Sequence, residues 1–200
     1  MTTTPLLSAT PIIDWEAANV RERAARLRRG ASTPEEIARA SFEWVRDRIA
    51  HTSDHGLDPV TCSASQVIQD ETGFCYAKSH LLAALLRANG IPAGFVYQRL
   101  ALDDGSFCLH GLNAVRLPSG WYRVDARGPK PGLVAEFTPP VERLPFRCSR
   151  PGETLFPGVW VDPLPVVVEA LRSYRRCADL VLHLPDAADP GPADVMFDAG

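Results

Sequence analysis

The sequence predicts an α+β fold in which a buried central helix with a cysteine at its start packs against an antiparallel sheet. The stretch 72–94 places Cys75 at the first turn of a helix rich in Ala and Leu. Two helix patterns, 14–29 and 34–50, precede this stretch. After it, the spacing of apolar residues changes from a period of 3.6 to a period of 2, which indicates strands.

The chain is expected to begin with a weakly defined segment followed by a helix. Residues 1–11 show no periodicity, which predicts a surface segment or an edge strand. The next pattern, 14–29, predicts a helix that Asp14 caps and that Gly30 ends. The residues available for packing are Trp15, Ala18, Ala25 and Leu27.

The second helix, 34–50, has the stronger start signal. Ser32 or Thr33 can cap it, and Pro34 suits its first position because an N–H there would have no helical partner. The face expected to be buried consists of Ile37, Ala40, Phe42, Trp44, Val45 and Ile49. A polar segment with Gly and Pro, 51–62, then predicts a loop.

A short helical turn, 63–70, leads to the central helix. The apolar residues of the central helix form two adjacent lines, which are Ala77, Leu81 and Leu85, and Leu82 and Leu86. Thr72 or Gly73 can cap its start, and 89–92 has the stop signal of a left-handed residue followed by proline. Cys75 therefore lies among the unpaired N–H groups of the helix start, whose partial positive charge favours the nucleophilic thiolate.

Three antiparallel strands are expected next, followed by a region of a different character. The segments 94–102, 107–117 and 121–125 alternate like strands and are separated by turns, so they predict a meander. Beyond residue 128 long regular elements are disfavoured, because 12 of the 18 prolines lie there. One helix is expected at 166–184, and the final stretch, 185–200, predicts a loosely held tail.

Length and composition predict one domain of an ordinary soluble protein. The chain has 200 residues, of which 46 % are hydrophobic and 22 % charged, and its net charge is −3. We expect a single domain over 1–200, with a core at about 32–128 and a proline-rich extension at 129–200. The near-neutral charge argues against nucleic acid as a partner, and the arginines between 21 and 29 are expected to form a solvated helix face.

The cysteines and the N-terminal sequence predict a cytoplasmic location. No run of about 18 apolar residues occurs, and MTTTPLLSAT lacks the basic start and the long apolar stretch of a secretory signal. We therefore expect neither export nor a membrane partner. Five cysteines, an odd number without a C-x-x-C pair, suit a reducing compartment. The sequence leaves the oligomeric state open.

A nucleophilic Cys75 needs a base and a group that orients the base. His80 is five residues along the same helix, about 140° around it from Cys75, so it points elsewhere. Three other histidines lie in a loop or near the tail, which leaves His110 as the candidate base. Asp125 ends a strand of aromatic and branched residues, where aspartate is disfavoured, and this position suggests a specific role.

The geometry of this triad depends on one hairpin turn. If residues 117–120 form a four-residue loop, Arg116 faces Trp121, and His110 and Asp125 share one face at a diagonal distance of about 7–8 Å. A loop of three residues would place them on opposite faces. The predicted triad therefore requires that Arg116 pair with Trp121, and the structure can test this strand register.

Other side chains offer candidates for supporting roles. The oxyanion would lie beside the N–H of Cys75 and one more donor, for which Gln69 and Gln66 are candidates, although both also suit a helix surface. An alternative metal site would use Cys75, Cys108 and His110, but a fourth ligand and the usual ligand spacing are missing. We expect no metal and no cofactor.

These motifs together resemble the transglutaminase-like superfamily of papain-fold cysteine enzymes. The shared features are G-x-C at the start of a helix, LLRANGIP, a histidine on the second strand and a W-x-x-x-D strand end, with VRDRI and SASQVI before the cysteine. The resemblance covers about 34–128. By motif position, Cys75, His110 and Asp125 correspond to the family's triad of nucleophile, general base and orienting carboxylate.

The resemblance implies a thiol-dependent acyl-transfer enzyme that acts on a peptide, protein or small amide. The family usually has Ala and an aromatic after the histidine, where this chain has Gly111 and Leu112, and it often has an acidic residue at the position of Val115. Without an aromatic tunnel, water should reach a thioester more easily than a lysine amine, so we expect hydrolysis. The alternatives are an amine-accepting transglutaminase and a catalytically silent binding or scaffold domain.

Overall fold

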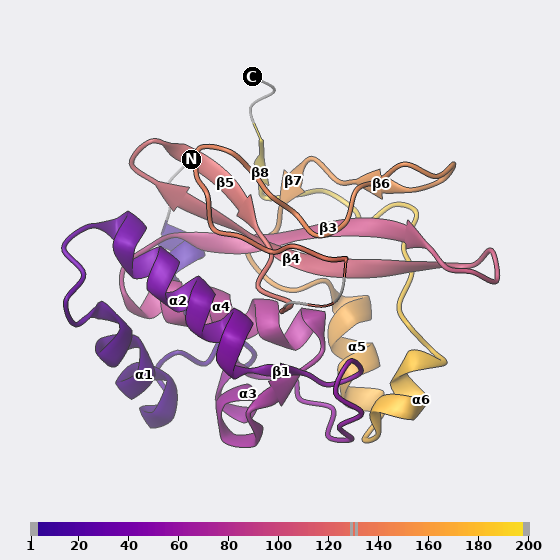
Figure 1. The fold of residues 1–200 in the computed structure, drawn as a ribbon, viewed down its shortest axis with the longest axis horizontal. Coiled ribbons are helices and arrows are strands. Elements are labelled where there is room, and N and C mark those ends of the chain that lie inside the picture. Colours follow the sequence, from indigo (N-terminus) through magenta and orange to yellow (C-terminus); the bar gives the residue numbers. More distant parts are fainter. Residues whose placement is uncertain (1–3, 129, 131, 198–200) are drawn as a thin grey trace.

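Helices on one side of an antiparallel sheet make up the fold (Figure 1). The computed structural model describes residues 4–128, 130 and 132–197. The helices are η1 (Thr4–Leu7), α1 (Ala18–Arg28), α2 (Pro34–Arg48), α3 (Ala64–Asp70), α4 (Cys75–Ala88), α5 (Pro165–Ser173) and α6 (Cys177–Val181). The strands are β1 (Ala50–His51), β2 (Thr72–Gly73), β3 (Ala93–Ala101), β4 (Phe107–Leu117), β5 (Gly120–Val124), β6 (Thr154–Leu155), β7 (Gly158–Val159) and β8 (Val195–Met196). Within the described part of the chain, no helix combines the length and the apolar character needed to cross a bilayer.

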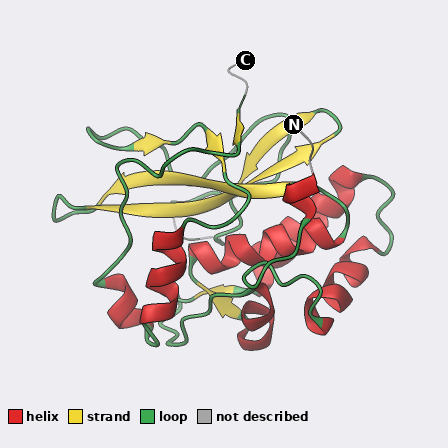
Figure 2. Cartoon of the chain, turned by 180° about the vertical axis from the view of Figure 1, so that it is seen from behind, coloured by secondary structure: helices red, strands yellow, loops and turns green. Residues whose placement is uncertain are grey.

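The predicted α+β class is confirmed, because the central helix α4 packs directly against the sheet (Figures 1 and 2). The sheet has the order β5-β4-β3-β6, and its first three strands are the predicted meander. The fourth strand, β6, comes from the proline-rich region and pairs with β3. The sheet therefore joins the predicted core to the segment that follows it.

Helix α4 is as buried as its Ala and Leu pattern predicts. Every residue from Cys75 to Arg87 is buried, and the helix touches α1, α2, α3 and the sheet. Its expected cap is wrong, however. Thr72 and Gly73 form β2, which pairs in parallel with β1, and the N-cap position falls to Phe74, whose side chain makes no capping hydrogen bond.

The hairpin between β4 and β5 has the spacing that the predicted triad requires. Leu117 pairs with Gly120, and Arg116 pairs with Trp121. Because this spacing is even, Asp125, which directly follows β5, lies on the same side of the sheet as His110.

The N-terminal elements differ from the prediction in two ways. Thr4–Leu7 forms the 3₁₀ helix η1, whereas an edge strand was one of the two expected forms; residues 1–3 lie outside the described part. Helix α1 begins at Ala18, and Asp14 does not cap it, because its carboxylate accepts a hydrogen bond from the Ser65 N–H at 3.0 Å in the first turn of α3. The residues that α1 buries are Val20 and Ala24, whereas the predicted Ala18 and Ala25 are exposed.

Helix α2 has the predicted cap and most of the predicted face. The Thr33 side chain accepts from the Glu36 N–H, and the Glu36 carboxylate accepts from the Thr33 N–H, which makes a capping box. Ala38 and Ser41 are buried, while the predicted Ala40 is only half-buried. The helix ends at Arg48, two residues earlier than expected, because the chain becomes extended at Ile49 and enters β1 at Ala50.

The C-terminal region is more ordered than its prolines suggested. The expected single helix is two helices, since the chain becomes extended at Tyr174, between α5 and α6. The stretch expected to be a loose tail is fixed as far as residue 197. Strand β8 pairs with β7, the Asp194 carboxylate accepts from the Val161 N–H at 2.8 Å, and the Trp160 Nε1–H donates to the Pro192 carbonyl at 3.1 Å.

Candidate active site

Cys75 begins the central helix at an end that has no side-chain cap. The N–H groups of such an end form the positive pole of the helix, which stabilises a negative sulfur. Lys78, one turn further on, donates to the Ile49 carbonyl at the end of α2, so the first turn of α4 is held in place. Cys75 is 5 % exposed and lines a cleft.

The first turn of α4 lies against the half of β4 with which β5 does not pair. The Tyr76 hydroxyl donates to the carbonyl of Leu109 on β4. A Cβ atom added to Gly111 would lie 2.9 Å from Tyr76 Cδ1, which is too close for a side chain. Glycine at this position therefore permits a close approach of α4 to β4, and this approach places Cys75 beside His110.

His110 is held between Asp125 and Cys75. Its Nε2 lies 2.6 Å from Asp125 Oδ2, and its other ring nitrogen is left for the hydrogen bond with the Cys75 side chain. The second carboxylate oxygen, Asp125 Oδ1, accepts from the Arg127 N–H at 2.9 Å. The three predicted triad residues are thus brought together, although they come from a helix start, a strand and the residue after a strand.

The surroundings of His110 favour its charged form. Burial of the imidazole acts to lower its pKa, but the negative charges of Asp125 and Cys75 and its hydrogen bonds to both raise the pKa of His110 to about 10. The nearby Cys108 behaves differently, since burial, with a contribution from Cys75, raises the pKa of its thiol to about 12. The two sulfurs are therefore distinct, and only Cys75 has an imidazolium as its partner.

The cleft beside this group has a volume of about 350 Å³ and aromatic walls. Tyr76 lines it from the first turn of α4, and Phe74 lines it from the position just before that helix. Phe146 lines it from the proline-rich region, with its ring edge-on to His110 at 4.7 Å between centroids. The Gln98 Nε2–H donates to the Phe146 carbonyl at 3.1 Å and fixes this segment on the sheet.

This arrangement corrects the expected lining of the site. Neither Gly111 nor Leu112 lines the cleft, because Gly111 faces Tyr76 and Leu112 belongs to a second apolar cluster with Val96 and Val159. The sequence has no aromatic residue directly after His110, but Phe146 places an aromatic ring beside His110 in the folded chain. The site therefore has an aromatic neighbour, contrary to the prediction from the sequence.

A set of charged residues lines the same cleft. The basic and acidic members are Arg127, Lys130, Arg147, Asp54 and Glu153. Asp54 forms an ion pair with Arg127 Nη2 at 2.8 Å, accepts from Lys130 Nζ at 3.1 Å, and lies 3.6 Å from His51 Nδ1. With three basic side chains against two acidic ones, the lining has an excess of positive charge.

The structure supports neither the predicted oxyanion donors nor the alternative metal site. Gln66 accepts from the N–H groups of Cys62 and Ser63 in the cap of α3, and Gln69 is exposed, so neither is retained as an oxyanion donor. Among the described residues, no three His, Cys, Asp or Glu side chains form a group that could hold a metal ion, and this applies to the set proposed around Cys108.

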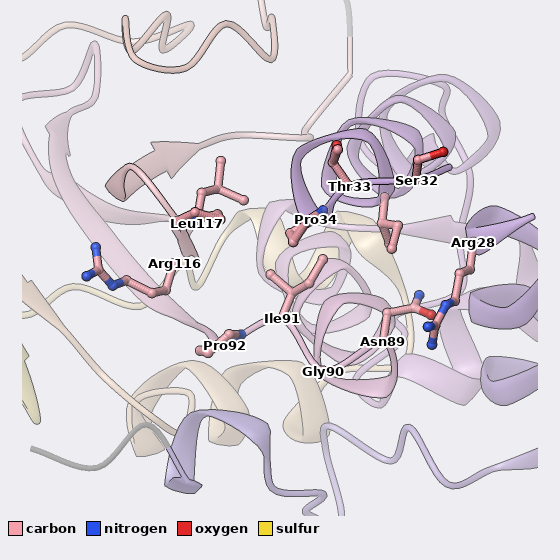
Figure 3. A pocket seen from close by; sticks show the side chains of 12 residues that line it. Arg28, Ser32, Thr33, Pro34, Asn89, Gly90, Ile91, Pro92, Arg116 and Leu117 are labelled. Carbon is pink, nitrogen blue, oxygen red and sulfur yellow. The ribbon is translucent and has the colours of Figure 1, made fainter. Parts of the chain in front are cut away.

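A larger cavity, of about 530 Å³, lies elsewhere, between the start of α2 and the end of β4 (Figure 3). Arg28 of α1 and Arg116 of β4 are among the residues that line it. The start of α2 provides few free N–H donors for a ligand in this cavity, because Pro34 has no N–H and the Glu36 carboxylate already accepts from the N–H groups of Ser32 and Thr33. The candidate site is therefore the smaller cleft, because Cys75 and His110 line it.

Several cleft residues were not identified from the sequence. Arg127 could have been found, since it lies two residues beyond Asp125 and follows the same strand. His51 and Asp54 were assigned to a loop, and no local pattern links them to Cys75. Phe146 lies 36 positions after His110, in a region with no periodicity, so only the folded chain reveals its contact.

Comparison with solved structures identifies similar folds. A candidate cysteine protease from Cytophaga hutchinsonii matches with a TM-score of 0.52 and 21% identity, over 62% of this chain and 42% of that one. The periplasmic domain of TgpA from Pseudomonas aeruginosa, bound to ethylmercury, matches with a TM-score of 0.47 and 24% identity, over 62% of this chain and 48% of that domain. This chain thus corresponds to less than half the length of either structure.

Sequence comparison gives the family. No curated protein is similar enough to count as a match. The model of the transglutaminase-like superfamily matches residues 21–126, which is more than half of the chain and includes the helix start and the strands described above. The first structural match has the same fold. The chain therefore belongs to the transglutaminase-like superfamily.

Proposed function

We propose that this protein is a thiol-dependent hydrolase that cleaves a peptide or amide bond through a thioester on Cys75. One observation carries the proposal: His110 lies between the Cys75 thiol and Asp125, 2.6 Å from the carboxylate, at the wall of a cleft. Nucleophile, base and orienting acid in this order are the parts that acyl transfer requires.

The proposed reaction has two halves. Cys75 Sγ attacks the amide carbonyl carbon and forms a C–S bond, while the carbonyl oxygen becomes an oxyanion beside the N–H groups at the start of α4. The imidazolium of His110 gives its proton to the leaving nitrogen as the C–N bond breaks, and an amine departs. Water then gives a proton to His110 and attacks the thioester, so that the C–S bond breaks and a carboxylic acid is released.

Asp125 is a positioning residue in this scheme. Its carboxylate accepts from His110 and from the Arg127 N–H, and these two bonds fix the orientation of the ring. It also stabilises the charged imidazolium, which the first step consumes and the second step restores.

The charge of the cleft supports water rather than an amine as the acceptor. A lysine acceptor approaches as an ammonium ion, and the three basic side chains that line the cleft repel it more than the two acidic ones attract it. The aromatic walls do not exclude an amine by themselves. The choice of water over an amine as the acceptor therefore rests on charge, and competition with a primary amine tests that choice.

Labelling with a fluorescent iodoacetamide, followed by mass mapping of the adduct, tests the proposal without a known substrate. Cys75 should react faster below neutral pH than glutathione does, because its imidazolium partner stabilises the thiolate. Cys148, a half-buried free cysteine outside the cleft, provides the matched control in the same sample. If Cys75 is no faster than Cys148 or glutathione, the protein is a silent domain on this fold and the proposal fails.

A further inference from the structure

One side of the cleft contains buried polar groups that the proposed reaction does not use. Arg127 is 7 % exposed and His51 is 6 % exposed, and both line the cleft. Within the described residues, Arg127 Nη1 and His51 Nδ1 have no hydrogen-bond partner. A buried donor without a partner costs free energy, which a ligand that supplies an acceptor would recover.

The position of Arg127 is tied to the reacting group. Its backbone N–H donates to Asp125 Oδ1 at 2.9 Å, so the residue is fixed relative to the proposed triad. Its guanidinium carbon lies 5.5 Å from the centre of the Phe146 ring, which itself lies edge-on to His110. A ligand group held by Arg127 would therefore lie close to the amide that Cys75 attacks.

The charges around Arg127 do not cancel. Asp54 is shared between Arg127 and Lys130, at 2.8 Å and 3.1 Å, so one carboxylate faces two cations. His51 adds no charge near neutral pH, since burial and the positive charge of Arg127 lower its pKa to about 3. This side of the cleft is left with one uncompensated positive charge, and guanidinium groups bind carboxylates with particular strength.

We infer that Arg127, assisted by Lys130, binds a carboxylate of the substrate next to the scissile amide. The substrates would then be acidic amides, such as peptides with a terminal carboxylate or an aspartate or glutamate side chain near the bond. This inference rests on the proposed function, because it takes Cys75 as the reacting group, and it adds the class of substrate.

Two alkylating agents of nearly the same size test the inference. Iodoacetate has a carboxylate where iodoacetamide has a neutral amide, and both transfer their CH₂ group to sulfur with loss of iodide. The measurement is the ratio of the iodoacetate rate to the iodoacetamide rate at Cys75, divided by the same ratio for glutathione. We expect at least about tenfold preference for iodoacetate, the factor that corresponds to one charge-assisted hydrogen bond of about 1.4 kcal/mol.

Substitutions assign this preference to its source. Arg127→Gln should abolish most of it, and Lys130→Gln, at a residue whose side chain is 53% exposed, should reduce it without disturbing the fold. Arg143→Gln is the matched control, since it removes the same charge from a surface pair with Glu136 at 3.0 Å and should leave the ratio unchanged. The charge of His110 is present in every variant, so the comparison isolates Arg127 and Lys130.

The outcomes separate this inference from the proposed function. Slow reaction of Cys75 with both reagents overturns the proposed function. Fast reaction with iodoacetamide but no preference for iodoacetate overturns the carboxylate site alone. A preference that survives both Arg127→Gln and Lys130→Gln also overturns it, because another group would then attract the anion. If Arg127→Gln does not fold, the Lys130→Gln result decides.

Protection experiments distinguish the two sources of a carboxylate. Acetyl-alanyl-alanine has only a terminal carboxylate, whereas acetyl-glutamyl-alaninamide has only a side-chain carboxylate. Whichever peptide slows iodoacetamide labelling of Cys75 in the native chain, but not in Arg127→Gln, identifies the source. If neither peptide protects better than acetyl-alanyl-alaninamide, the carboxylate site is overturned.

Discussion

Gly111→Ala tests the close approach of α4 to β4 with a single methyl group. That methyl would lie 2.9 Å from Tyr76 Cδ1, 3.5 Å from Tyr76 Cα and 3.6 Å from Tyr97 Cε1. Carbon atoms in contact prefer about 3.5–4.0 Å, so the Tyr76 ring must move by about 0.6 Å or more. The ring has little room, since Tyr76 is 1% exposed and its hydroxyl is fixed on the Leu109 carbonyl.

The expected cost follows from two opposing effects. Overpacking a core by one methyl group destabilises by about 1–3 kcal/mol, and the smaller freedom of alanine in the unfolded chain returns about 0.4–1 kcal/mol. We expect a net loss of about 1–2 kcal/mol in the free energy of unfolding. Because Tyr76 adjoins Cys75, the rate of Cys75 alkylation should fall as well.

Urea unfolding and iodoacetamide labelling measure both effects. The double variant Gly111→Ala/Tyr76→Leu provides the control, because removal of the ring should relieve the overlap and make the two costs non-additive. Gly111→Ala with the stability and labelling rate of the native chain would refute the reasoning. So would strict additivity in the double variant.

The other predictions concern the reaction and the core. Cys75→Ala should abolish turnover and leave the melting temperature nearly unchanged, whereas a large loss would mean that the thiol is only a packing residue. Leu81→Ala and Leu85→Ala should each cost about 2–5 kcal/mol in urea unfolding, since both side chains are 0% exposed, and near-neutral values would contradict this. The pKa of His110 is raised from 6.5 to about 10, so the imidazolium persists through neutral pH. Asp125→Asn should lower that pKa, so Cys75 alkylation near pH 7 should slow, and an unchanged rate would contradict the role of Asp125. Finally, millimolar primary amine added with a peptide amide donor should yield more acid than amine adduct, and the reverse would favour a cross-linking enzyme.

The parts of the structure that sequence reasoning could reach are those with a local period. The Ala and Leu lines of α4 identified a buried helix, since a 3.6-residue period has one physical interpretation at that length. The relation between His110 and Asp125 was also accessible, because the parity of one hairpin turn decides which face each side chain takes. Pairing of Arg116 with Trp121 confirmed that condition.

The parts that sequence reasoning missed depend on contacts between distant segments. Asp14 had the right chemistry for a helix cap but serves α3, a different helix, through Ser65. The tail looked unstructured because its prolines exclude long elements, yet a two-residue strand and the hydrogen bond of Trp160 fix it. The unpaired atoms Arg127 Nη1 and His51 Nδ1 could not be predicted from the sequence, because whether a polar atom has a partner depends on the side chains that fold around it.

The contact between Phe146 and His110 has a consequence for how relatives are compared. The family model ends at residue 126, so the part of the chain that is inherited as a recognisable unit stops before this wall of the cleft. A fragment ending there would keep Cys75, His110 and Asp125 and lose the part of the cleft wall that includes Phe146 and Arg147. Relatives with equal cores and unrelated sequences after the aspartate are thus expected to share chemistry and differ in selectivity. Alignments restricted to the core would therefore group such proteins together even where the far wall of the cleft differs.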